Sequence, residues 1–181
     1  MIGDVLPWAA LLVLLGLWML GAYNRITALR AAVLAAWGPV DQLMGQRGQA
    51  LAHLLVALTE PLAAEAAALD AVAQAQVQVQ ITLDAARRLP VAPDTIADLS
   101  KADAVLAAVS ARVLALVEQQ PLLRASAPVA QALATISAAP AQLAFARRVF
   151  NQAGENYNLA TRQFPTRLLG AVLRFAEAGR L

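Results

Sequence analysis

"ISAAPAQLAFARRVFNQAGENYNLATRQFP", residues 136–165, is the stretch of sequence that decides the fold. Large side chains recur in it every seven residues, and alanines recur three positions after them. The large residues are Ile136, Leu143, Phe150, Tyr157 and Phe164, and the alanines are Ala139, Ala146, Ala153 and Ala160. This is the a/d pattern of helices that pack along a seam, and alanine at one seam position lets a neighbouring helix approach closely. The stretch therefore predicts a long helix in a tightly packed bundle.

Helix-compatible sequence also fills most of the chain after residue 22. Proline and glycine clusters divide it into helices, which we expect at about residues 23–59, 62–89, 94–119 and 128–163. The third helix carries an apolar face that can pack on the seam: Ile96, Leu99, Leu106, Val109, Val113 and Leu116. Asp94 is the expected N-cap of this helix because it follows Pro93. We therefore predict an all-α fold with an antiparallel up-and-down four-helix bundle over residues 23–164.

One segment resembles a strand. Residues 74–83, "QAQVQVQITL", alternate polar and apolar side chains with a period of two. Alanine-rich helical sequence flanks the segment, and an isolated strand would have no partner to pair with. We therefore expect it to be helical.

An uncharged apolar stretch near the N-terminus, residues 5–22, indicates a membrane protein. Its length at the helical rise is ~27 Å, close to the ~30 Å hydrocarbon core of a bilayer. A cleaved signal peptide is the alternative, but no basic residue precedes the stretch and "GAYN" is a poor cleavage context. We expect residues 1–22 to remain as a transmembrane anchor, with Trp8 and Tyr23 at the two lipid headgroup layers.

Basic residues lie on only one side of the apolar stretch. Arg25 and Arg30 follow it, and no lysine or arginine precedes it. By the positive-inside rule, the bundle is predicted to be cytoplasmic, although two arginines leave the periplasmic orientation open.

The segment after Pro165 has the pattern of an amphipathic helix. Its apolar face includes Leu169, Leu173 and Phe175, and its polar face includes Arg167 and Arg174. Such a helix either lies on the membrane with its arginines facing lipid phosphates or packs on the bundle. We expect residues 165–181 to form a short amphipathic interfacial tail.

An even number of bundle helices has a consequence for the ends of the chain. If the first helix leaves the membrane and the fourth returns, Phe164 comes back to the end that carries Tyr23 and Asn24. The second Tyr-Asn pair, Tyr157 and Asn158, is then expected near this membrane-proximal end.

The residues that carry chemistry in enzymes are sparse. The chain has no cysteine, which excludes disulfides and thiolate chemistry. Its single histidine, His53, is followed by Leu54, Leu55, Val56 and Ala57, so a metal or general-base site there would lack nearby partners. The net charge of +2 is too small to argue for nucleic acid. We expect no catalytic residues, no metal, no cofactor and no nucleic acid partner.

Several motifs along the chain belong together. "YNRITALRAAVLAAWGPVDQLM" follows the apolar stretch, and "ARRVFNQAGENYNLATRQFP" ends the last long helix. With a single N-terminal span before them, they resemble the LemA family of bacterial membrane-anchored helical bundles over nearly the whole chain. The motif residues are Tyr23, Asn24, Trp37, Asp41, Arg147, Arg148, Asn151, Tyr157, Asn158, Phe164 and Pro165. The resemblance implies a place in the bacterial inner membrane and a role as an anchored scaffold or adaptor.

Two non-enzymatic functions follow from this. One is a scaffold that self-associates and organises or shapes the membrane. The other is an adaptor that binds a membrane enzyme or protease at the bilayer surface. Expected partners are membrane lipids, other copies of the chain and other membrane proteins. We favour the scaffold because a chain with 60% hydrophobic residues should leave apolar surface to be covered by a second copy.

Overall fold

The computed structural model describes residues 2–164 and 177–181, and it describes side chains from residue 8 onward within that range. The elements in this part of the chain are all helical. They are α1 (Ile2–Leu58), a short 3-10 helix η1 (Ala63–Glu65), α2 (Ala66–Arg88), α3 (Pro93–Glu118), a short α4 (Pro121–Ala125) and α5 (Ala127–Arg162). The predicted all-helical fold is confirmed, and "QAQVQVQITL" lies within α2 as expected.

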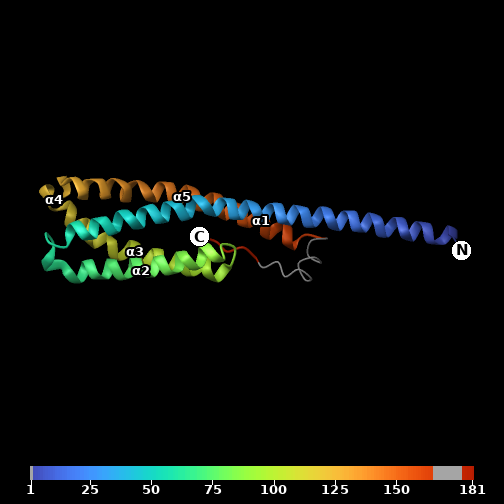
Figure 1. Cartoon of the computed structure of the whole chain (residues 1–181), viewed down its shortest axis with the longest axis horizontal. Coiled ribbons are helices and arrows are strands. Elements are labelled where there is room, and N and C mark those ends of the chain that lie inside the picture. The colour runs from blue at the N-terminus through green and yellow to red at the C-terminus, as the bar shows by residue number, and fades with distance from the viewer. Residues whose placement is uncertain (1, 165–176) are drawn as a thin grey trace.

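α1 is one continuous helix, and its N-terminal part extends well past the other helices (Figure 1). The side chains of residues 8–21 are all exposed although nearly all are apolar. Burial begins at Ile26 and continues at helical spacing through Val33, Trp37 and Val40. The helix therefore has an apolar projection up to about residue 22 and a packed part beyond it.

Among the described residues, two helices are long and apolar enough to cross a membrane, α1 and α5. They differ in how their most apolar part is used. In α1 only 6% of an 18-residue apolar stretch is buried inside the protein, whereas 28% of the corresponding stretch of α5 is buried. The apolar surface of α5 serves partly as core, while that of the α1 projection is exposed, although Trp18 contacts Phe164.

The packed part of the molecule, residues 23–162, is called the helical body below. In it α5 lies along α1, and α2 lies along α3 (Figure 1). α1 also contacts α2. The short α4 lies at the far end of the body, beside the turn that joins α1 to α2 (Figure 1).

The seam predicted on α5 forms the centre of the core. Leu143, Phe150 and Tyr157 are buried, as expected from the heptad. Phe150 meets Trp37 of α1 edge-on, with ring centroids 5.7 Å apart. Phe164 departs from the pattern, because it is exposed beyond the end of the helix. The heptad therefore holds where a neighbouring helix faces it.

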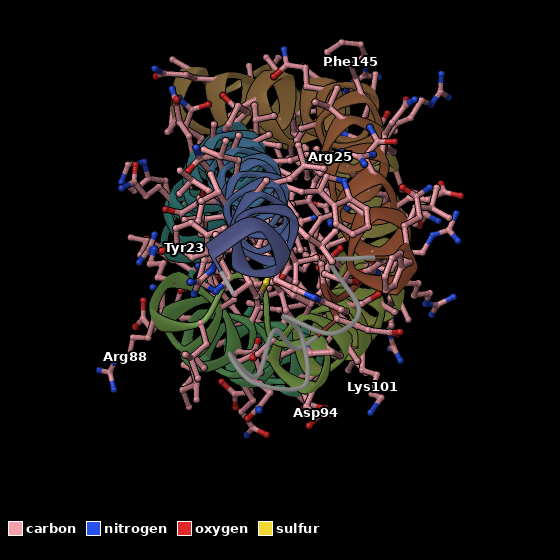
Figure 2. The ribbon with its side chains drawn as sticks, turned by 90° about the vertical axis from the view of Figure 1, so that its right-hand side faces the viewer. Tyr23, Arg25, Arg88, Asp94, Lys101 and Phe145 are labelled. Atoms are coloured by element: carbon pink, nitrogen blue, oxygen red, sulfur yellow. The ribbon has the colours of Figure 1, made fainter. Side chains whose placement is uncertain are left out.

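The start of α3 differs from the prediction. The helix begins at Pro93, whose missing N–H is harmless in the first turn, and the capping position is Ala92. The prediction that Asp94 is the N-cap is wrong, because Asp94 lies within the first turn and caps nothing. Figure 2 shows Asp94 directed away from the body, as are Arg88 and Lys101. An acidic residue in a first turn still complements the helix dipole.

Candidate functional site

A buried carboxylate, Asp103 on α3, joins three helices. Arg47 of α1 and Arg147 of α5 both donate hydrogen bonds to it, and the Arg147 Nη2 atom lies 2.5 Å from Oδ2. Burial alone would raise the pKa of Asp103. The hydrogen bonds and charges of Arg47 and then Arg147 outweigh burial and hold the pKa below its ordinary value. The carboxylate therefore stays ionised and ties α1, α3 and α5 together.

Arg147 is the only one of these three residues that the sequence motifs point to. Its predicted neighbour in the motif, Arg148, is exposed. Asp41, another motif residue, accepts a hydrogen bond from Arg87 of α2, with Nε and Oδ1 2.7 Å apart. This hydrogen bond raises the pKa of Arg87. Asp41 thus links α1 to α2 at a second point, which is more exposed than the site of Asp103.

The end of α5 lies beside the start of the helical body, as predicted. Arg25 donates a hydrogen bond to Gln163 at 3.2 Å, and the ring of Phe164 contacts Trp18. In Figure 2 Arg25 lies on the side of α1 that faces α5, whereas Tyr23 lies on the opposite side. The predicted interface residues of α1 are exposed: Trp8, Tyr23, Arg25 and Arg30. This end of the body can therefore meet a membrane surface.

The predicted interfacial tail is described only at its end. Pro165, Arg167, Leu169, Leu173, Arg174 and Phe175 lie outside the described residues. The last five residues, Glu177–Leu181, do not lie free of the body. Ala178 and Gly179 are buried.

Two asparagines of α5 hold this terminal segment by its backbone. The Asn158 side chain donates to the Ala178 carbonyl at 3.1 Å and accepts from the Ala178 N–H at 2.7 Å. The Asn151 side chain likewise donates to the Leu181 carbonyl at 2.7 Å and accepts from the Leu181 N–H at 2.9 Å. Each amide therefore pairs with both backbone groups of one residue. We call Asn151 and Asn158 the asparagine clamp.

The α2–α3 connection forms the other wall around the terminal segment. The Gly179 N–H donates to the Val91 carbonyl at 3.0 Å. A Cβ atom on residue 179 would lie 2.8 Å from Ile96 Cβ and 2.9 Å from Pro93 Cα, so only glycine fits without a shift. At the open end, Arg162 donates two hydrogen bonds to one Glu177 carboxylate oxygen, at 3.0 and 2.7 Å.

An apolar groove runs between α1 and α5 on the outside of the body. Its volume is about 560 Å³, and its lining includes Ala36, Pro39, Leu43, Phe145 and Val149. Phe145 is 68% exposed, and Figure 2 shows it directed outward from α5, on the side away from α2 and α3. The groove combines a large exposed ring with an apolar floor.

His53 lies exposed on α1. Among the described residues there is no cluster of three or more histidine, aspartate or glutamate side chains that could hold a metal ion.

Comparison with known proteins places the chain in a family. No curated protein matches it. The family model of the LemA family matches residues 36–180, a range that contains Trp37, Asp41, the Asp103 cluster and the asparagine clamp. Because this match takes in most of the chain, the protein belongs to the LemA family.

Proposed function

We propose that this LemA-family protein is a non-enzymatic scaffold, anchored in the bacterial inner membrane by residues 1–22, that self-associates and organises the membrane around it. The anchor is supported by the apolar projection of α1, whose side chains at residues 8–21 are exposed. Arg25 and Arg30 follow the projection and favour a cytoplasmic body. In this proposal the body acts as an antiparallel up-and-down four-helix bundle.

The observation that carries self-association is the apolar groove between α1 and α5. Phe145 stands at its edge with 68% of its surface exposed, although an aromatic side chain gains most when buried. The groove lies within the body, so a bilayer that holds the anchor does not cover it. A second copy can bury Phe145 against the floor formed by Ala36, Pro39 and Leu43.

A non-catalytic role is supported by the partners of Asp103 and of the asparagine clamp. Asp103 is paired with two arginines, and the asparagine clamp is paired with backbone groups. These groups hold helices and the terminal segment together. A catalytic acid or base would instead have an open position for a substrate.

The mass of the particle that the full-length protein forms in mild detergent tests self-association. We expect the wild-type protein to be a homo-oligomer and the Phe145→Ser variant to be a monomer. Ile81→Ser is the matched control, because Ile81 is a large exposed apolar residue on α2, away from the groove. It should leave the oligomer intact. A monomeric wild-type protein overturns the scaffold and favours the adaptor, with the groove binding a membrane enzyme or protease.

Carbonate extraction of membranes tests the anchor separately. The protein should stay in the membrane pellet, and its N-terminal sequence should begin before Trp8. A mature protein that begins near Tyr23 contradicts the anchor. A reporter fused after Leu181 tests the orientation, since a reporter active only in the periplasm contradicts a cytoplasmic body.

A further inference from the structure

The terminal segment Glu177–Leu181 lies on the helical body as a bound peptide does. Figure 1 shows this end of the chain beside the turn between α2 and α3, far from the distal end that carries α4. We propose that the asparagine clamp is a peptide-recognition site, that Glu177–Leu181 is its built-in ligand, and that the site accepts the same motif from a second chain.

Backbone recognition is the first argument for a built site. Asn151 and Asn158 are two helical turns apart, and the residues they hold, Leu181 and Ala178, are three apart. Two turns of α-helix rise ~10.5 Å, and three residues of extended chain span ~10 Å. The clamp therefore matches an extended peptide that runs antiparallel to α5. Its amides substitute for the hydrogen bonds that a neighbouring strand would provide.

Side-chain selectivity is the second argument. Position 179 must be glycine, because a Cβ atom there would collide with Ile96 and Pro93. We expect position 178 to favour a small residue, because Ala178 is buried beside Gly154. The ligand class is thus an extended peptide with an acidic residue, a small residue, glycine, any residue and an aliphatic residue in that order.

The bonds themselves do not require the ligand to belong to the same chain. All five backbone hydrogen bonds of Ala178, Gly179 and Leu181 go to α5 side chains or to Val91. A separate peptide offers the same five groups. The attached segment has the advantage of a high effective concentration, on the order of millimolar for a short tether. A free peptide therefore competes poorly until the attached segment is displaced.

The Gly179→Val variant of the full chain empties the site while leaving the clamp intact. We expect a fluorescein-labelled peptide, Glu-Ala-Gly-Arg-Leu amide, to bind this variant, with fluorescence anisotropy as the measurement. Binding to the wild-type protein should be at least about tenfold weaker because the attached segment competes. The same peptide with valine in place of glycine should not bind.

Removing the clamp provides the matched control. Adding Asn151→Leu and Asn158→Leu to Gly179→Val removes four hydrogen bonds, so we expect a loss of affinity of at least about tenfold. Equal binding with and without the asparagines overturns the proposal, as does a lack of binding to Gly179→Val. If circular dichroism shows that Gly179→Val is unfolded, deletion of Glu177–Leu181 in the full-length protein takes its place.

A mixing experiment identifies the source of the motif. One copy carries Gly179→Val and has an empty clamp, and the other carries Asn151→Leu and Asn158→Leu and has an unbound terminal segment. Both also carry Phe145→Ser, so that association through the α1–α5 groove cannot contribute. Association of the two copies assigns the motif to a second copy of this chain. Separate copies overturn the supply of the motif by a second copy, even where the clamp still binds the free peptide.

Discussion

Trp18 lies edge-on against Phe164, with ring centroids 5.1 Å apart and ring planes inclined at 61°. Trp18 belongs to the apolar projection of α1, whereas Phe164 follows the end of α5. The contact joins the proposed anchor to the chain just beyond the end of α5. With residues 1–22 in a bilayer, it brings the end of α5 down to the membrane surface.

Spin labels can measure the depth of this contact. The chain has no cysteine, so Phe164→Cys and Gln152→Cys each give a single labelling site. In vesicles we expect the label at 164 to be accessible to lipid-soluble oxygen. The label at 152 lies ~18 Å further along the helix and should meet the water-soluble reagent instead. Equal accessibility to the water-soluble reagent at both positions would place the whole of α5 away from the membrane.

Substitution of Phe150 tests whether the predicted seam forms the core. Its side chain is fully buried and contacts Trp37, so Phe150→Ala loses both transfer free energy and the edge-on contact. We expect the free energy of unfolding to fall by about 3–5 kcal/mol. Gln152→Ala is the control on an exposed face of α5 and should be nearly neutral. Chemical denaturation in detergent measures both, and similar losses would show that the heptad does not define the core.

Asp103→Ala should be strongly destabilising for a different reason. It leaves the positive charges of Arg47 and Arg147 in a partly buried site without their partner. We expect a loss of about 3–5 kcal/mol from the removal of one member of such a cluster. Replacing all three residues with apolar ones of similar volume should cost much less, since no charge is then left unpaired. A triple variant as unstable as Asp103→Ala would contradict this account.

The pH dependence of stability follows from the lowered pKa of Asp103. Its folded-state pKa is below the ordinary value of 3.8, so the ionised form is favoured by folding. The stability it contributes is fully present above the unfolded pKa and is lost as the pH falls through the folded pKa. The stability difference between wild type and Asp103→Asn should therefore narrow below about pH 4. Thermal unfolding of both proteins between pH 7 and pH 3 measures this stability difference. A stability difference that stays constant would show that Asp103 does not titrate in this range.

Local pattern was enough to predict the helices and most of the α5 seam. Leu143, Phe150 and Tyr157 are buried because a seven-residue repeat places them on one face, which is a property of the helix alone. Asp94 was mispredicted because the helix starts at Pro93, two residues earlier than a cap at Asp94 requires. That difference depends on local backbone geometry, which residue preferences resolve only to within a residue or two.

The polar contacts between distant segments could not be predicted in the same way. Asp103 lies at core spacing between Leu99 and Leu106, so its burial had a sequence signal, but its two arginine partners come from helices far along the chain. The asparagine clamp had less signal still. Asn151 and Asn158 are evident as a repeat, yet their partners are backbone groups of Ala178 and Leu181, which carry no distinguishing side-chain chemistry.

The continuity of α1 has a mechanical consequence. A single helix from Ile2 to Leu58 has no loop between the projection and the body, so a change in the tilt of one part is passed to the other. The part from Tyr23 to Leu58 is ~53 Å long at the helical rise, and a tilt of ~20°, typical of membrane spans, displaces its far end sideways by ~18 Å. Tilting is one way in which a span longer than the local bilayer thickness accommodates the mismatch. If residues 1–22 span a bilayer as proposed, a change in the tilt of the span would move the end of the body that carries α4 sideways.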